Sequence, residues 1–244
     1  MLNDYFNRLI VFDIETASEC ETLDHLMDEK GPHKVELWRK RCTWLRNRYP
    51  ENANLTDDQL YVEKAALQPE FSKIICISIA QIKGDGESIV IKSYASCDEK
   101  EILTDFVKLN ASILGKIPGA TYCGHNIKRF DVPFIAKRLA INGIQIPTNF
   151  QIFKMKSWEI PFMDTGDIWS FGAWQEGFSS LDLICECLGV PTPKNKMEGK
   201  DVGPAYFSGK LDEIKTYCEK DVEATCRVIL KLSHIDKNPF VERK

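Results

Sequence analysis

Leu9-Ile-Val-Phe-Asp-Ile-Glu-Thr16 is the most informative run of residues in this chain. Apolar residues rich in β-branched and aromatic side chains lead into two carboxylates, which is typical of a buried strand over about residues 8–15. Because strand side chains alternate between faces, Asp13 and Glu15 share one face while Ile14 points to the other. Two ionised carboxylates at that spacing repel by about 2–3 kcal/mol. Either a cation or a proton must compensate this repulsion, unless both acids simply reach water at a strand end.

Composition and charge bound the class of protein. The chain has 244 residues, of which 43% are hydrophobic and 28% charged, and this balance suits a globular fold with a sizeable core. The formal net charge of −4 argues against a protein coated with positive charge, but it leaves room for a local basic groove. No run approaches the length of a membrane span and no signal peptide is evident, so we expect a cytoplasmic protein without membrane contact.

The cysteines indicate neither a zinc site nor a disulfide framework. There are nine of them, an odd number, and several lie in apolar runs. No CxxC occurs, and no Cys/His cluster has zinc-ligand spacing. We therefore expect buried free thiols in a reducing compartment.

The order of predicted elements indicates an α/β fold with a mixed sheet in a single domain, residues 1–244. An antiparallel hairpin comes early, and crossover helices come later. Neither GxGxxG nor GxxxxGK[ST] occurs, which excludes the common nucleotide-binding folds. Beyond the first strand, the pattern predicts strands at about 73–81, 88–94, 119–124 and 162–165, a helical insertion at about 19–68, helices capped at Ser96 and Ser179, helices at 130–142 and 211–233, and a polar loop at 194–203.

A second acidic motif is Gly124-His-Asn-Ile-Lys-Arg-Phe-Asp131, where the fourth predicted strand passes into a helix. Active-site groups in α/β sheets often lie at such a junction. Asp131 falls in the first helical turn, where the helix dipole favours an anion. Taken alone, it is either a first-turn acid or a metal ligand.

A third motif, Tyr217-Cys-Glu-Lys-Asp221, lies in the last predicted helix. The i, i+4 spacing stacks Tyr217 and Asp221 on one face, beside the apolar stripe. An acid at the inward edge of a helix needs a partner. That partner is either a metal ion or a distant arginine.

In chain order the motifs are Asp-x-Glu, Asn-x₃-Phe-Asp and Tyr-x₃-Asp. This set resembles the DEDD superfamily of 3′–5′ exonucleases in its tyrosine-bearing branch, which includes polymerase proofreading domains and RNase D. The run from Leu67 to Ser78 further resembles stand-alone exonucleases related to the family-B polymerase proofreading domain. The resemblance implies a ribonuclease H-like mixed β-sheet flanked by helices.

The resemblance also implies roles for individual residues. Asp13, Glu15 and Asp221 would hold one Mg²⁺ or Mn²⁺. Asp13 would bridge to a second ion, which Asp131 would reach directly or through water. Tyr217 would orient the attacking water. Phosphodiester hydrolysis agrees with this set, because two ions activate water and neutralise the developing charge, and oxygen ligands select Mg²⁺ or Mn²⁺ over zinc.

Other residues near these motifs are candidates for binding the substrate. Asn126 could bond the 3′-terminal nucleotide or fix its loop, and Phe130 could pack against the terminal base or in the core. His125 is not interpreted as the base, because the third motif carries a tyrosine. Cap or loop roles are favoured for Asp164 and Asp167. The substrate-binding set is Ile14, Thr16, Asn126 and Phe130.

The insertion carries a basic, aromatic segment over residues 34–48, in which one acid, Glu36, opposes the cations. Two interpretations stay open. It is either an arm that guides a single strand into the acidic site, or a surface helix that buries its tryptophans. The residues concerned are Lys34, Trp38, Arg39, Lys40, Arg41, Trp44, Arg46 and Arg48, with Tyr49 directly after them.

The predicted function is therefore a two-metal 3′–5′ exonuclease that releases nucleoside 5′-monophosphates from single-stranded DNA. One alternative is an RNase D-like exoribonuclease. Another is a catalytically silent nucleic-acid-binding module, against which the intact acidic set argues. A phosphotransferase with Asp13 as nucleophile would be expected to carry Asp-x-Asp, whereas Glu15 stands at the second position.

Overall fold

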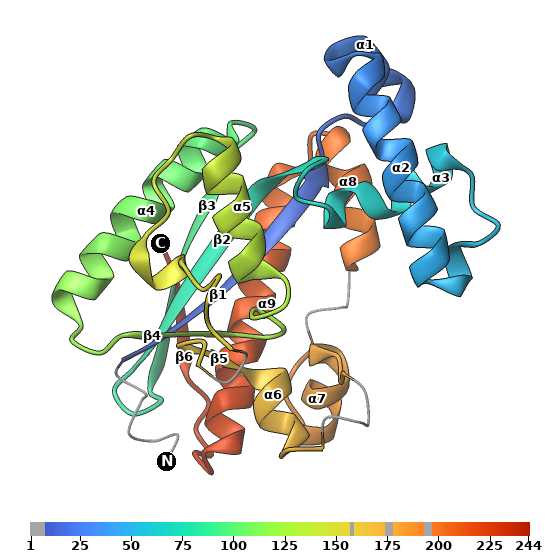
Figure 1. The fold of residues 1–244 in the computed structure, drawn as a ribbon. Coiled ribbons are helices and arrows are strands. Elements are labelled where there is room, and N and C mark those ends of the chain that lie inside the picture. Colours follow the sequence, from blue (N-terminus) through green and yellow to red (C-terminus); the bar gives the residue numbers. More distant parts are fainter. Residues whose placement is uncertain (1–7, 157–158, 174–177, 193–196) are drawn as a thin grey trace.

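A mixed β-sheet forms the centre of the molecule in this computed structural model, which describes residues 8–156, 159–173, 178–192 and 197–244. The strand order is β5-β4-β1-β2-β3-β6, and β1 is antiparallel to β2 but parallel to β4 (Figure 1). This mixed, helix-flanked sheet confirms the predicted fold class. The strands are β1 Leu9–Ser18, β2 Ser72–Lys83, β3 Ser88–Ala95, β4 Thr121–Gly124, β5 Phe162–Asp164 and β6 Phe240–Arg243.

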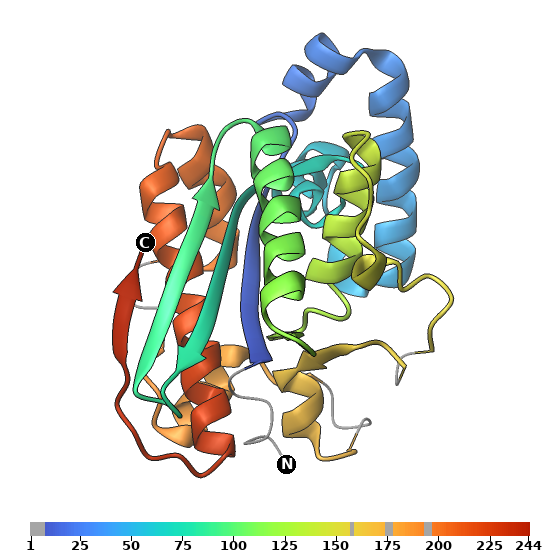
Figure 2. The ribbon, with the colours of Figure 1, turned by 90° about the vertical axis from the view of Figure 1, so that its left-hand side faces the viewer.

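Helices cover both faces of the sheet, as Figure 2 shows with α4 on one side and α9 on the other. The predicted insertion is helical and consists of α1 Leu23–Lys30, α2 Pro32–Arg48 and α3 Asp57–Lys64, with short 3₁₀ turns η2 Pro50–Asn52 and η3 Ala65–Leu67. The remaining helices are α4 Glu99–Lys116, α5 Asp131–Ile141, α6 Thr165–Ser170, α7 Leu181–Leu188, α8 Gly199–Phe207 and α9 Leu211–Leu232, with a 3₁₀ turn η4 Thr148–Phe150. Among the described residues, no helix is both long and apolar enough to cross a membrane.

The alternation of β1 determines which face carries the acids. Ile10, Phe12 and Ile14 pack in the cluster that contains residues of α4 and α5. Leu9 and Val11 point the other way, into the cluster built with α9. Side chains two residues apart share a face, so Asp13 and Glu15 follow Leu9 and Val11 on the side of α9. The predicted alternation is confirmed.

Two irregularities of β1 shape the region around these acids. β4 pairs with β1 only from Leu9 to Val11, so the rest of that edge has no strand partner there. On the other edge, the register with β2 shifts between Glu15 and Thr16. Such a bulge bends a strand and redirects side chains, and bulges are common beside active sites. Pattern alone did not predict it.

The insertion has a small core of its own. Trp38 is buried, and its ring packs edge-on against Tyr61 at 5.2 Å and Phe71 at 5.0 Å. Phe71 directly precedes β2, and the Thr16 hydroxyl of β1 donates to the Ala66 carbonyl at 2.8 Å. These contacts join the insertion to the central sheet.

Several local expectations were wrong. The segment 194–203 was expected to be a loop, but α8 begins at Gly199; Lys194 and Lys196 lie outside the described residues. α8 buries Val202 and Ala205, and this sparse apolar pattern, with Pro204 inside it, did not predict a helix. The N-caps are Asp98 and Ser180, not Ser96 and Ser179. Helix α6 and edge strand β6 were not predicted, because both are too short for their periodicity to stand out.

Candidate active site

A pocket of about 320 Å³ opens where β1, α5 and α9 meet. All nine residues predicted for catalysis, metal binding or substrate binding line it, although they come from three distant parts of the chain. None of the described residues that line this pocket is a lysine or an arginine. The predicted set is Asp13, Ile14, Glu15, Thr16, Asn126, Phe130, Asp131, Tyr217 and Asp221. We call this cavity the acidic pocket.

The carboxylates of Asp13 and Glu15 lie close together on β1, and both are largely shielded from water. Glu15 is buried, and burial together with Asp13 and Asp221 raises its pKa well above the ordinary value. The pKa of Asp13 is also raised, first by burial and then by Asp131 and Asp221. The two β1 acids are therefore repelled by Asp131 of the second motif and by Asp221 of the third. A cation in the pocket would relieve it.

Asp131 begins α5 and turns its carboxylate toward β1. Its Oδ1 accepts a hydrogen bond of 3.1 Å from the backbone amide of Ile14, on the edge that β4 leaves unpaired. Asp131 is 3% exposed, and burial raises its pKa to about 7. Hydrogen bonds from backbone amides oppose that rise. The residue is thus more than a first-turn acid, because it contacts the strand that carries the other motif.

Tyr217 and Asp221 lie one turn apart on α9, and both line the acidic pocket. Burial raises the pKa of Tyr217, and Asp221, Glu15 and Asp13 raise it further. Tyr217 therefore keeps its phenolic proton and can donate a hydrogen bond at neutral pH. Asp221 in turn contributes to the raised pKa of each β1 acid. No distant arginine is needed to explain why Asp221 lies at the inner edge of α9.

The loop that carries Asn126 has a fixed, unusual backbone. Asn126 adopts the left-handed conformation, at φ 61°, and its amide donates to Asp164 Oδ1 at 2.9 Å. The Lys128 amide donates to the other carboxylate oxygen of Asp164 at 3.2 Å. Gly124 has no room for a side chain, because a Cβ there would lie 2.6 Å from the Phe12 carbonyl oxygen. Asp164 thus fixes the loop and caps α6, as expected, while the Asn126 side chain borders the pocket.

The other three predicted substrate-binding residues also have structural partners. Phe130 is half-buried, with its ring 5.2 Å from that of Phe134, so it both packs against the core and lines the pocket. The Ile14 side chain belongs to the core. The Thr16 hydroxyl donates to Ala66. Their roles toward a substrate stay predictions.

Comparison with known proteins places this arrangement in a family. Residues 65–240 match the model of a family described as predicted 3′–5′ exonucleases related to the exonuclease domain of PolB. The chain belongs to this family. Asp131, Tyr217 and Asp221 fall inside the match to the exonuclease family, whereas Asp13 and Glu15 precede it. The contacts of β1 with α5 and α9 join these two acids to the matched part of the exonuclease fold.

The fold has a counterpart among solved structures. A family B DNA polymerase from the hyperthermophilic archaeon Pyrobaculum calidifontis superposes with a TM-score of 0.57 and 15% identity. The superposition covers 93% of this exonuclease-family chain and 24% of the polymerase chain. At that identity the likeness supports a shared fold alone. No curated protein matches the chain in sequence.

The donor set fits the divalent ions that such an exonuclease would require. Carboxylates of Asp13, Glu15, Asp131 and Asp221 border one pocket, and burial raises the pKa of the first three. Oxygen donors of this kind suit Mg²⁺ or Mn²⁺. A bound cation would favour the charged carboxylates that burial and mutual repulsion disfavour.

Sequence reasoning missed several residues in or beside the pocket. The Cys218 thiol lies 3.5 Å from Asp13 Oδ2, and its Sγ lies within 4.8 Å of carboxylate oxygens of both Asp13 and Glu15. The only signal for it was its place between Tyr217 and Asp221. His125 also lines the pocket; burial lowers its pKa, and its Nδ1 lies 2.9 Å from the Thr165 hydroxyl oxygen, while its exclusion as the base stays a prediction. Leu67 and Phe178, about half exposed, form apolar walls of the pocket, and neither was predicted to line it.

Proposed function

We propose that this member of the exonuclease family hydrolyses phosphodiester bonds from the 3′ end of single-stranded DNA, with two Mg²⁺ or Mn²⁺ ions, and releases nucleoside 5′-monophosphates. One observation carries the proposal. Four carboxylates and a protonated tyrosine, from three separate motifs, line a single pocket whose described lining includes no lysine or arginine. The relation of the family to the exonuclease domain of PolB favours DNA over RNA.

The residues have distinct roles in the proposal. Asp13, Glu15 and Asp221 would hold one ion, and Asp13 with Asp131 would hold the second. When bound, the ions would lower the pKa of the attacking water and neutralise charge on the phosphate in the transition state. The Tyr217 hydroxyl, kept protonated by its surroundings, would orient that water. The acidic pocket without ions would repel a phosphate, which makes the reaction dependent on metal.

The walls of the pocket support a terminal nucleotide as the substrate. The volume of about 320 Å³ lies at the lower end of the range for small-ligand sites. Leu67, Phe130 and Phe178 offer apolar surface for a base, and Asn126 offers an amide for a sugar or phosphate oxygen. The proposal treats residues 1–244 as one domain, because the end of the insertion is bonded to β1, the strand that carries Asp13 and Glu15. It keeps the expected location in the cytoplasm.

Digestion of end-labelled strands tests the proposal. The chain is incubated with 5′-labelled single-stranded DNA or RNA of equal length, in Mg²⁺, Mn²⁺ or EDTA. Metal-dependent shortening from the 3′ end, abolished by Asp13→Asn, is the expected result. The matched control is Asp212→Asn, an exposed acid on the same α9 helix, which should leave the rate unchanged. Faster digestion of RNA would move the assignment to an exoribonuclease.

Tyr217→Phe separates orientation of water from binding of the strand. The variant removes one hydroxyl and keeps the ring, so hydrolysis should slow by about 10–100-fold while the affinity for DNA changes little. Equal losses in rate and affinity would contradict the water-orienting role. If wild-type protein binds DNA but never shortens it in any metal, the chain is instead a silent binding module.

A further inference from the structure

One face of α2 carries a row of cationic and aromatic side chains that are exposed or, at Arg41, partly exposed. Arg41, Trp44 and Arg48 follow one another at spacings of three and four, so they lie along one face of the helix. Tyr49 directly follows Arg48 and is the C-cap residue of α2. Trp44 is 47% exposed and Tyr49 is 40% exposed. We call these four residues the α2 stripe.

The side chains of the α2 stripe contact one another. The Arg41 guanidinium lies 5.3 Å from the Trp44 ring centroid, and the Arg48 guanidinium lies 5.5 Å from that of Tyr49. The two rings are 6.0 Å apart and nearly perpendicular. Cations and ring faces therefore alternate in one exposed patch. Unpaired bases stack on such rings while guanidinium groups bind the flanking phosphates.

The core of the insertion does not require this row. Its buried members on α2 are Val35, Trp38, Cys42 and Leu45, which lie on the neighbouring face of the helix. Trp38 is fully buried, and its indole nitrogen donates to the Asp57 carbonyl at 3.0 Å. Of the two interpretations of the segment, the surface-helix one describes Trp38. It leaves the exposed rings of Trp44 and Tyr49 without a structural reason.

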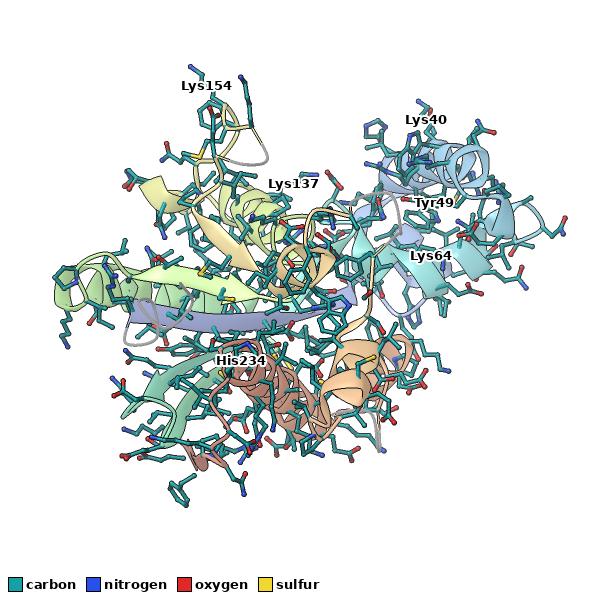
Figure 3. The ribbon with its side chains drawn as sticks, turned by 90° about the horizontal axis from the view of Figure 1, so that it is seen from below. Lys40, Tyr49, Lys64, Lys137, Lys154 and His234 are labelled. Atoms are coloured by element: carbon teal, nitrogen blue, oxygen red, sulfur yellow. The ribbon has the colours of Figure 1, made fainter. Side chains whose placement is uncertain are left out.

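An ion pair brings Arg41 of the α2 stripe close to the segment that supplies a wall of the acidic pocket. Arg41 lies 3.7 Å from a Glu70 carboxylate oxygen, and Lys137 of α5 lies 3.0 Å from the other. Glu70 is three residues from Leu67, a wall of the pocket, so their Cα atoms are at most about 11 Å apart. Figure 3 labels Tyr49 and Lys64 on the insertion and Lys137 on α5 across from it.

The charge of α2 also suits a polyanion. It carries six lysines and arginines against one glutamate, in a chain whose net charge is −4. Several of these cations are paired, as Arg46 is with Asp57. Arg48 has no carboxylate within 4.0 Å among the described residues. Arg48 thus offers a charge beside the exposed ring of Tyr49, whereas Arg41 shares its charge with Glu70.

We propose that the α2 stripe is a second binding site, which holds the unpaired nucleic-acid strand some nucleotides away from the 3′ end in the acidic pocket. Trp44 and Tyr49 stack on bases, and Arg41 and Arg48 bind phosphates. The direction of the bound strand, with its 3′ end in the acidic pocket, rests on the proposed function. Binding of a strand to the α2 stripe does not. The stripe lies before residue 65, where the family match begins, so membership of the family does not imply it.

Length-dependent binding tests the second site. Fluorescence anisotropy in Mg²⁺, with hydrolysis-resistant phosphorothioate linkages in the strands, measures the affinity for 5′-labelled dT₅ and dT₂₀. Wild type should bind dT₂₀ more tightly, and Trp44→Ala with Tyr49→Ala should weaken dT₂₀ binding by about tenfold or more while leaving dT₅ unchanged. Val62→Ala, at an equally exposed apolar position on α3, is the matched control and should bind both as wild type does.

Other outcomes overturn the inference. Unchanged dT₂₀ binding in the double variant would assign the stripe to another partner, such as a protein. Loss of dT₅ and dT₂₀ binding together would mean that the substitutions disturb the pocket, and no preference of wild type for the longer strand would mean that no second site exists. Replacing dT₂₀ by rU₂₀ distinguishes DNA from RNA. If the protein binds dT₂₀ as expected but never hydrolyses DNA, the proposed exonuclease function fails while the second binding site stands. The two proposals can therefore fail separately.

Discussion

The backbone amide of Ile14 donates a hydrogen bond to the carboxylate of Asp131 at 3.1 Å, across 117 residues of sequence. Ile14 stands between Asp13 and Glu15, so this bond ties the acids of β1 to the start of α5. It forms where β4 has ceased to pair with β1. An amide that would otherwise be an unpaired strand edge therefore positions the acid of a second motif.

Substitutions of Asp131 should show separately what its charge and its hydrogen bond to Ile14 contribute. Asp131→Asn keeps an oxygen that can accept from Ile14 but removes the charge, so hydrolysis should fall by roughly 100-fold or more. In EDTA near pH 8 the same variant should be at least as stable as wild type, because Asp131, with its pKa raised to about 7, is mostly ionised there and the asparagine removes that buried charge. Thermal unfolding and the digestion assay measure the two effects.

Asp131→Ala provides the contrast. It removes the acceptor as well, and the buried Ile14 amide is left without its partner, so this variant should lose about 1–3 kcal/mol of unfolding free energy relative to Asp131→Asn. Equal stability of the two variants would show that the hydrogen bond contributes nothing. Full activity in either variant would remove Asp131 from the proposed metal site.

Stability of the metal-free protein should depend on pH in a definite direction. Asp131 has a folded pKa of about 7 against an ordinary value of 3.8, and the pKa values of Asp13 and Glu15 are raised as well. Between the ordinary pKa and the raised pKa, the folded state binds more protons than the unfolded state. The free energy of unfolding therefore falls as pH rises from about 4 to about 7. The change should be on the order of a few kcal/mol.

Divalent ions should reverse that trend. Mg²⁺ or Mn²⁺ binds the ionised carboxylates, so the rise in melting temperature on adding metal should be larger near pH 8 than near pH 5. Scanning fluorimetry with metal or EDTA at each pH measures this rise. Asp13→Asn with Asp131→Asn should flatten both dependences. A metal effect of the same size at every pH would argue against these carboxylates as the ligands.

The sequence predicted the acidic pocket better than the segments around it. Asp13 and Glu15 lie in a strand whose alternation is regular, and Tyr217 and Asp221 lie in a long amphipathic helix with one clear stripe. These periodic signals fix which way a side chain points once the element is known. The convergence of three motifs in one pocket follows, because each occupies a position that the topology brings to the same end of the sheet.

The parts that sequence did not predict depend on long-range contacts. The bulge after Glu15 and the Asp164 bonds that fix the Asn126 loop leave no local signature. α8 buries only two side chains, so its helical pattern is weak. Periodicity puts Trp38 in one row with Val35, Cys42 and Leu45 and leaves Trp44 out of it, but it does not tell that Tyr61 of α3 and Phe71 cover that row.

Thiol reactivity should follow the burial of the cysteines. All nine are free, and Cys97 and Cys187 are the exposed ones. Burial raises the pKa of Cys218, which keeps it protonated and unreactive beside Asp13. Titration of the native protein with a thiol reagent should therefore show two fast groups, and denaturant should release the other seven. Fast labelling of Cys218, identified by peptide mapping, would mean that the inner face of α9 beside Asp13 is open to solvent.

Removing the guanidinium of Arg138 should destabilise the fold and the pocket together. Arg138 and Glu99 are both buried, with Nε and Nη2 bonded to the carboxylate at 2.8 and 2.6 Å. Glu99 also accepts from the Ile74 amide at 2.7 Å, and Arg138 donates to the Pro69 carbonyl at 2.7 Å. Arg138→Ala leaves an uncompensated buried charge, so we expect a loss of about 3–5 kcal/mol by urea unfolding.

Glu99→Gln in the Arg138→Ala background tests that cause. It removes the unpaired charge but keeps an acceptor for Ile74, so it should recover part of the lost stability, whereas Glu99→Gln alone should destabilise the wild type. Because α5 carries both Arg138 and Asp131, the single Arg138 variant should also hydrolyse DNA more slowly when folded. A loss below about 1 kcal/mol, or no recovery in the double variant, would show that burial of this pair does not govern stability.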